Sequence, residues 1–161
     1  MGQVPVLRTD DGELLTENPA VLQYVADRYP RSGLAPQGGF ERYGLQQWLN
    51  FITSELHKQF TPLFAADTPA EYGDVAKQKI RRRFDWLEGE LRGKDYLLGK
   101  QFTVADGYLY AVASWSKFVG IDLGKWPELA VYLQRVAARP KVRQALIAEG
   151  LVRESAAQAV S

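Results

Sequence analysis

Four polar side chains near the middle of the chain could bind and activate a small ligand. Asn50, Ser54 and His57 recur at steps of four and three, which places them within about 60° of arc on an α-helix. Lys58 follows, so the set offers an amide, a hydroxyl, an imidazole and an ammonium group. We therefore predict a site for a small zwitterionic or anionic ligand. Polar residues at this spacing also form ordinary solvated faces, which is the alternative interpretation.

A long amphipathic helix that begins near Phe40 must position these side chains. From this residue onward the apolar period changes from two to about 3.6 residues. The residues that recur at steps of three and four as its apolar stripe are Leu45, Trp48, Leu49, Ile52 and Leu56. The pattern predicts that this stripe packs against other helices and that the polar set lies on a separate face.

Four further helices are predicted to pack with the first. Their expected starts are Pro69, Thr103, Pro127 and Pro140, and Gly93 and Gly150 are expected to end the first and the last of them. Thr103 and Asp106 can exchange hydrogen bonds with first-turn amides as a capping box, so we predict a structural role for both. The helix that Thr103 begins carries so many apolar residues that we expect protein on all its sides.

The start of the chain has strand character. Val4 to Thr9 and Glu13 to Thr16 are short apolar runs separated by an Asp-Asp-Gly turn, which predicts an antiparallel hairpin. Asn18 is expected to cap the helix that follows, with Pro19 at its first position. The residues expected on the inner face of this helix are Val21, Tyr24 and Val25.

Composition excludes several classes of function. The 161 residues hold no cysteine and one histidine, which excludes disulfides, a cysteine nucleophile and a multi-histidine metal site within this sequence. A net charge of +1 gives no field that would attract nucleic acid or anionic lipid, and no early apolar run is long enough for a signal peptide or a membrane span. We therefore expect no metal, nucleic-acid or membrane partner, and a cytoplasmic location. Acidic residues on both sides of a basic cluster predict a solvated helix face. The cluster is Lys77, Lys79, Arg81, Arg82 and Arg83, and its acidic neighbours are Glu71, Asp74, Asp85, Glu88 and Glu90.

Several segments together resemble the bacterial beta-class glutathione transferases. The segment from Trp48 to Lys58 resembles one helix of that family, and the others are Gly2 to Pro5, Leu14 to Thr16 with Glu17, Phe102 to Asp106, and Ala138 to Pro140 with Val142, Ala145, Leu146 and Glu149 to Leu151. The resemblance covers nearly the whole chain.

The resemblance implies a mainly α fold, in which a partial thioredoxin-like β-hairpin plus helix precedes a glutathione-transferase-type helical bundle. Residues 1–30 would form the partial glutathione-binding domain, and residues 31–39 a linker, consistent with the richness of this stretch in Pro and Gly. Residues 40–161 would form the all-helical carboxy-terminal domain. The family is usually homodimeric and uses glutathione as a co-substrate, without a further cofactor, in detoxification.

The resemblance also implies roles for residues near the amino terminus. Val4 would present its backbone to the cysteinyl unit of glutathione, and Pro5 would follow a cis bond, although most X-Pro bonds are trans. Glu17 would accept the γ-glutamyl amino group. Asn18 would help to hold the adjacent carboxylate at a helix amino terminus, where the family usually has a small residue such as serine.

In the helical part, the resemblance implies that His57 is the catalytic residue, which orients or deprotonates the glutathione thiol. Lys58 would approach the glycyl end, and Asn50 and Ser54 would reach glutathione across the dimer interface. Trp115 would line the pocket for a hydrophobic electrophile, with an ordinary core tryptophan as the alternative.

Family members carry a strand, a helix and a second strand before the segment that opens this sequence, with the Cys, Ser or Tyr that contacts the glutathione sulfur. The resemblance thus implies that the first half of the amino-terminal domain is absent, and we expect a second copy, a partner or local disorder at the hairpin edge. Three interpretations follow. The chain is a transferase, in which His57 assists the thiol, or it is a non-catalytic dimerisation or ligand-binding module. In the third, the sequence has a displaced start or a trimmed end.

Overall fold

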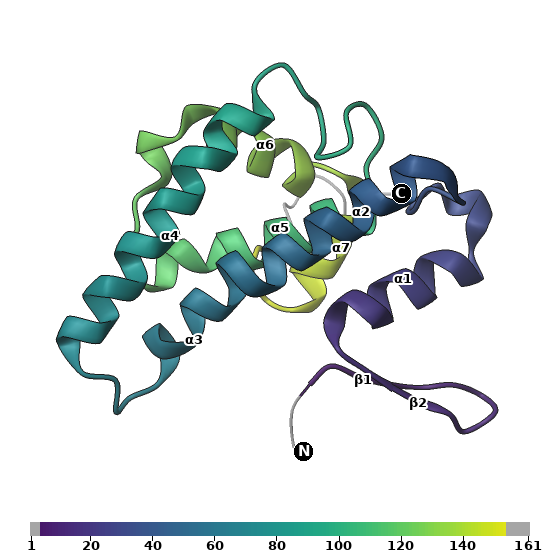
Figure 1. Ribbon diagram of the computed structural model, residues 1–161, viewed down its shortest axis with the longest axis horizontal. Coiled ribbons are helices and arrows are strands. Elements are labelled where there is room, and N and C mark those ends of the chain that lie inside the picture. Colours follow the sequence, from purple (N-terminus) through teal and green to yellow (C-terminus); the bar gives the residue numbers. More distant parts are fainter. Residues whose placement is uncertain (1–3, 154–161) are drawn as a thin grey trace.

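The computed structural model describes residues 4–153 and opens with a β-hairpin (Figure 1). Strands β1 (Val6–Arg8) and β2 (Leu14–Thr16) pair antiparallel, with Leu7 opposite Leu15. Gly12 closes the turn with φ of +87°, a conformation that glycine adopts at little cost. The predicted hairpin is confirmed. Residues 1–3 and 154–161 lie outside the described residues. They include Gly2 and Gln3 of the family-like motif, the start of the predicted domain 1–30 and the end of the predicted domain 40–161.

Helix α1 (Asn18–Arg28) begins one residue earlier than predicted. The carbonyl of Glu17 accepts the first helical hydrogen bonds, from the amides of Ala20 and Val21, both at 3.0 Å. Glu17 therefore occupies the cap position, and no side chain caps the helix. The prediction of Asn18 as the cap is wrong, because Asn18 already lies in the first turn.

The inner face of α1 also differs from the prediction. Leu22 and Ala26 contact the hydrophobic core of the helical part, and Ala26 is fully buried. Tyr24 and Val25 instead face the hairpin, where they line a surface hollow with Leu7. Of the three residues predicted on the inner face, Val25 is exposed, whereas Val21 and Tyr24 are partly buried but do not belong to the core of the helical part.

The predicted linker is anchored to the helical part. It contains a short 3₁₀ turn, η1 (Pro30–Ser32), and a buried residue, Ala35, that belongs to the core. The carbonyl of Leu34 accepts a hydrogen bond from the amide of Val104 at 2.9 Å. This bond ties the segment after α1 to the start of the central helix, α5 (Val104–Ser114).

One long helix crosses the molecule and changes its type midway (Figure 1). It consists of α2 (Gly39–Phe51), a π-helical segment η2 (Ile52–His57) and α3 (Lys58–Phe64). All five residues of the predicted apolar stripe are buried. The stripe was predicted correctly, but the π-helical segment, in which hydrogen bonds close over five residues, was not.

Helix α5 (Val104–Ser114) packs against α1, α2 and η2. The expectation of protein on all its sides is wrong, because Ala111 is exposed and, with Gly107, Tyr110 and Ser114, lines a surface hollow. Helix α4 (Ala70–Leu91) packs along α3, and α6 (Pro127–Ala137) packs on both α4 and α5. Helix α7 (Pro140–Ala148) follows, and two short 3₁₀ turns, η3 (Trp115–Phe118) and η4 (Leu123–Lys125), connect α5 to α6. The structure is mainly helical, as predicted.

Asp106 holds the start of α5 in place. Its carboxylate accepts four hydrogen bonds at 2.7–2.9 Å, and the donors are the amide and hydroxyl of Thr103, the amide of Leu97 and the hydroxyl of Tyr132. Asp106 is fully buried. Burial, together with the adjacent Asp106 carboxylate, raises the pKa of Tyr132 well above its usual value. The predicted capping box is confirmed and extends to α6.

The basic residues of α4 lie on a face that is largely open to water, as their acidic neighbours in the sequence predict. Arg83 pairs there with Glu55, with its Nε 2.9 Å from the carboxylate. Between residues 4 and 153, no helix combines the length and the hydropathy that a membrane span requires.

Candidate functional site

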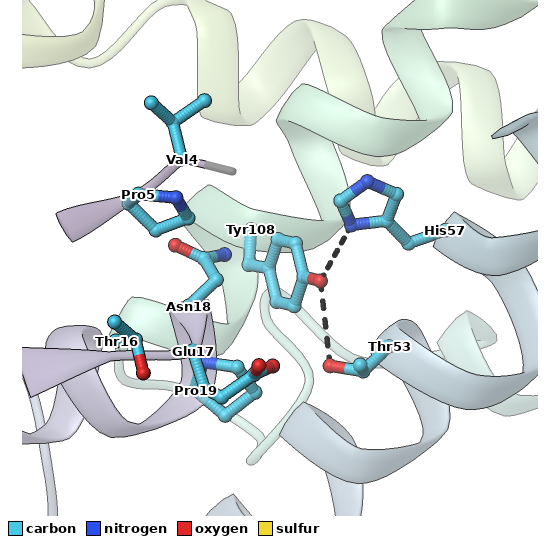
Figure 2. A pocket seen from close by; sticks show the side chains of 9 residues that line it. All are labelled: Val4, Pro5, Thr16, Glu17, Asn18, Pro19, Thr53, His57 and Tyr108. Atoms are coloured by element: carbon cyan, nitrogen blue, oxygen red, sulfur yellow. Dashed lines mark hydrogen bonds between the residues drawn. The ribbon is translucent and has the colours of Figure 1, made fainter. Parts of the chain in front are cut away.

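A small cavity of about 150 Å³ lies where the hairpin and α1 face the helical part (Figure 2). Side chains from the hairpin and the start of α1 approach it from one side, and side chains of η2 and α5 from the other. The lining residues are Val4, Pro5, Thr16, Glu17, Asn18, Pro19, Thr53, His57 and Tyr108. We call this cavity the polar pocket.

The hairpin side of the polar pocket has two unusual backbone features. The Val4–Pro5 bond is cis, as the resemblance implied. Glu17 has φ of +70° and ψ of +116°, and it is the one non-glycine residue with positive φ in the part of the chain that the structure describes. Such a conformation costs on the order of 1–3 kcal/mol and is typical of functional sites. The surrounding structure therefore holds Glu17 at the pocket against its local preference.

His57 is the titratable group at the centre of the helical side. Its Nδ1 lies 2.7 Å from the hydroxyl oxygen of Tyr108, and its other ring nitrogen, Nε2, makes no hydrogen bond with any residue between 4 and 153. The ring is half-buried, and this burial lowers the pKa of His57 from its ordinary value of 6.5. At neutral pH the imidazole is therefore mainly uncharged and can accept a proton.

Thr53 completes a polar cluster with His57 and Tyr108 (Figure 2). Its Oγ1 lies 3.3 Å from the Tyr108 hydroxyl and donates a hydrogen bond to the Leu49 carbonyl at 2.8 Å. Thr53 precedes His57 by four residues, so the two side chains lie on one face of the helix.

Three of the four residues in the predicted polar set do not line the polar pocket. Asn50, Ser54 and Lys58 are exposed, and the Ser54 hydroxyl donates to the Asn50 carbonyl at 2.9 Å. The predicted ligand site of four residues therefore stays a prediction for Asn50, Ser54 and Lys58, which lie on the open surface beside the pocket. His57 alone of the set enters the pocket, together with the predicted Val4, Pro5, Glu17 and Asn18.

Sequence reasoning missed the other four lining residues, Thr16, Pro19, Thr53 and Tyr108. Tyr108 lies among the apolar residues of the central helix and is 6% exposed. A signal was present, because a buried tyrosine usually needs a hydrogen-bond partner for its hydroxyl group. Its partner, His57, lies 51 residues away in the sequence and could not be identified without the fold.

A second, apolar hollow of about 460 Å³ adjoins the first at His57. Its lining residues are His57, Thr61, Phe64, Trp115 and Phe118. The rings of His57 and Trp115 meet edge to face, and the rings of Phe60 and Phe64 also lie nearly perpendicular to the indole. We call this space the apolar hollow. Trp115, predicted to line an apolar pocket, lies in its wall.

The donor set of the polar pocket suits an organic ligand with charged ends. It offers one carboxylate, one amide, three hydroxyl groups and one imidazole. Within residues 4–153, no group of three or more His, Asp or Glu side chains is arranged to hold a metal ion.

Comparison with known proteins gives consistent matches. Residues 51–140 match the model of the glutathione S-transferase C-terminal domain. Glutathione S-transferase GstA of Escherichia coli O157:H7 is 44% identical over 151 residues, which span 93% of this chain and 75% of that protein. Among curated relatives, glutathione S-transferase GST-4.5 of Xanthomonas campestris is 34% identical, over 93% of this chain and 77% of that protein.

Solved structures agree in sequence and in fold. A ternary complex of BphK, a bacterial glutathione transferase, is 51% identical with a TM-score of 0.90, over 92% of this chain and 75% of that one. A sphingomonad glutathione S-transferase complexed with glutathione is 47% identical with a TM-score of 0.89, over 94% of this chain and 76% of that one. A beta-class enzyme of Sphingomonas chungbukensis is 45% identical with a TM-score of 0.90, over 94% and 76%.

Proposed function

Because this chain belongs to the glutathione S-transferase family, we propose that it binds glutathione in the polar pocket and conjugates it to a hydrophobic electrophile in the apolar hollow. The observation that carries the proposal is the position of His57, which lines both spaces. A sulfur atom beside this imidazole would be within reach of a reactant on either side. The relatives are named as transferases, so the non-catalytic module is not favoured.

The proposed glutathione contacts on the hairpin side follow from charge. The Glu17 carboxylate accepts the α-ammonium group of the γ-glutamyl unit. Asn18 lies in the first turn of α1, where the helix dipole favours the neighbouring carboxylate. Val4 offers its backbone to the cysteinyl unit beside Pro5. Together these contacts direct the thiol toward His57.

Three residues outside the polar pocket have proposed roles that do not require them to line it. Lys58 is exposed next to His57 and attracts the glycyl carboxylate. Asn50 and Ser54 reach the glutathione of a second copy across a dimer interface. Their exposure in the single chain supports this placement.

The proposed reaction needs one base and no further cofactor. His57, mainly neutral at pH 7, accepts the proton of the glutathione thiol. The thiolate sulfur then forms a bond to an electrophilic carbon, and the leaving group departs with its electron pair. Trp115 and the neighbouring phenylalanines of the apolar hollow hold the apolar body of the electrophile.

We further propose a homodimer that uses the outer face of α2 and α4. Trp86 is 42% exposed although it stacks on Phe51 with ring centroids 4.6 Å apart. Phe40 and Tyr43 on α2 are more exposed still. An aromatic group of this size at the surface is typical of protein interfaces.

Calorimetric titration with glutathione, followed by a conjugation assay with a chromogenic chloronitrobenzene, tests the proposal. We expect saturable binding and turnover, with kcat/KM lowered at least about a hundredfold in His57→Ala. Arg81→Ala, on the exposed face of α4, is the matched control. Binding without turnover in the unmodified protein would refute the catalytic proposal and support the ligand-binding module. The absence of binding would refute both.

A further inference from the structure

Four polar groups form a continuous row from the polar pocket to the backbone of α2. The row runs from His57 Nδ1 to the Tyr108 hydroxyl at 2.7 Å, then to Thr53 Oγ1 at 3.3 Å and to the Leu49 carbonyl at 2.8 Å. Figure 2 shows the first two of these contacts as dashed lines. The row connects the proposed base to a fixed acceptor in the core.

The carbonyl end of the row sets the direction of the first hydrogen bond. A carbonyl oxygen can only accept, so Thr53 must use its single hydroxyl proton toward Leu49. Toward Tyr108, Thr53 can therefore act only as an acceptor. This leaves the single proton of Tyr108 with two possible directions, toward Thr53 or toward His57.

The two directions of the Tyr108 hydroxyl proton differ in how many of the three contacts in the row are true hydrogen bonds. If Tyr108 donates to His57, the oxygens of Tyr108 and Thr53 face each other at 3.3 Å with no proton between them. If Tyr108 donates to Thr53, all three contacts become hydrogen bonds, provided that His57 donates from Nδ1. Unsatisfied polar contacts in a buried site are costly, and linked hydrogen bonds strengthen one another.

We propose that Tyr108 and Thr53 hold neutral His57 in the tautomer with the proton on Nδ1, so that the lone pair of Nε2 is the proton acceptor of the polar pocket. This inference rests on the proposed function for its catalytic meaning, although the tautomer itself can be measured without it. Tyr108 and Thr53 are positioning residues, because they act through His57.

The tautomer decides what His57 can do to a thiol. With the proton on Nδ1, Nε2 takes the thiol proton and the ring becomes an imidazolium whose Nδ1 still donates to Tyr108. With the proton on Nε2, the neutral ring could only donate to sulfur and could not act as the base there. The row of donors therefore selects proton acceptance over donation.

The chain contains one histidine, which makes the tautomer directly observable. Long-range ¹⁵N–¹H correlation spectra at pH 8 distinguish a protonated ring nitrogen from an unprotonated one. We expect the protonated signal at Nδ1 and the unprotonated signal at Nε2 in the protein without ligand. The reverse assignment would overturn the inference, whatever the enzyme activity.

Substitutions of Thr53 test the direction of the row. Thr53→Val keeps the shape of the side chain but removes the acceptor, so Tyr108 is free to donate to His57 and the tautomer should change to protonated Nε2. Thr53→Ser keeps the hydroxyl group and should keep the tautomer. If the tautomer is the same in Thr53→Val as in the unmodified protein, Thr53 does not set the direction and the inference fails.

Kinetics then separate this inference from the proposed function. We expect kcat/KM to fall about tenfold or more in Thr53→Val, with glutathione affinity nearly unchanged and activity restored in Thr53→Ser. Tyr108→Phe should release the ring and give a mixture of tautomers. A protein with the expected tautomer but no turnover would refute the transferase proposal alone. An active protein with protonated Nε2 would refute this inference alone.

Discussion

Trp115 lies edge to face against His57, with ring centroids 4.8 Å apart and planes inclined at 73°. Tyr108 holds the same imidazole by its Nδ1. Tyr108 lies in α5 and Trp115 opens η3, the 3₁₀ turn that continues directly from α5, so one stretch of chain fixes both the position and the environment of the ring. The indole excludes water from one side of His57, and the phenol holds its orientation.

From the edge-to-face contact between the two rings, we expect Trp115 to control the pKa of His57. Trp115→Ala should raise the pKa of His57 toward its ordinary value, because burial is what lowers it. An NMR titration of the single histidine measures the change, with Trp86→Phe as a control at a distant tryptophan. A pKa of His57 that stays the same in Trp115→Ala would show that the indole does not cause the shift. We also expect a higher KM for the electrophile.

The lowered pKa of His57 predicts a dependence of stability on pH. Between the lowered pKa of the folded state and the ordinary value of 6.5, the unfolded chain binds more protons than the folded one at this residue. The contribution of His57 to stability is therefore present above pH 6.5 and is lost as the pH falls through the folded pKa. Other groups near the ring are Glu17 and Tyr108 in the polar pocket and the exposed Lys58.

Chemical denaturation of the unmodified protein and of His57→Gln, from pH 8 to pH 5, measures this contribution. The difference in unfolding free energy between the two proteins should shrink, or change sign, as the pH decreases. A difference that is constant over this range would contradict the lowered pKa.

We expect the substitution Asp106→Asn to cause a large and specific loss of stability. In Asp106→Asn an amide nitrogen replaces one acceptor oxygen, so donors from Thr103, Leu97 or Tyr132 lose their partner in a buried site. We expect the free energy of unfolding to fall by about 3 kcal/mol. Urea denaturation measures it, and Asp122→Asn, which affects one exposed hydrogen bond, should cost below about 1 kcal/mol. Equal losses in the two variants would refute the role of Asp106.

We expect the substitution Glu17→Gly to raise stability and to weaken glutathione binding. Glu17→Gly relieves the positive φ, and we expect a gain of about 1 kcal/mol in unfolding free energy. Glu17→Ala keeps the strained backbone and should show no such gain. Both variants lack the carboxylate, so calorimetry should show similarly weakened glutathione binding in both. Unchanged glutathione affinity in Glu17→Ala would remove this carboxylate from the proposed site.

The parts of the fold that the sequence predicted depend on strong local patterns. The stripe from Leu45 to Leu56 follows one period, and the capping box of Thr103 and Asp106 needs only neighbouring residues. The third and fourth donors to Asp106 come from Leu97 and Tyr132, which no local pattern connects to it. Local signals thus predicted the elements, and the contacts between elements required the fold.

The candidate site could be predicted only in part for the same reason. His57 was chosen for its chemistry and the hairpin residues for a family resemblance. Thr53 was missed because its place in the site depends on a contact with Tyr108 of α5, which no local pattern shows. Asn18 has the composition of a cap, but the backbone of Glu17 takes that position.

The π-helical segment η2 also bears on how this chain tolerates insertions and deletions. A π-helical turn accommodates one more residue than an α-helical turn, and the helices on both sides keep their packing. Loss of one residue, such as Ser54, would let the segment close as an α-helix while Leu49 and Phe60 stay in the core. The same loss would shorten the spacing from Thr53 to His57 and separate both from Tyr108. In this family, a single-residue gap in an alignment of this segment would therefore mark a change of site chemistry within an intact fold.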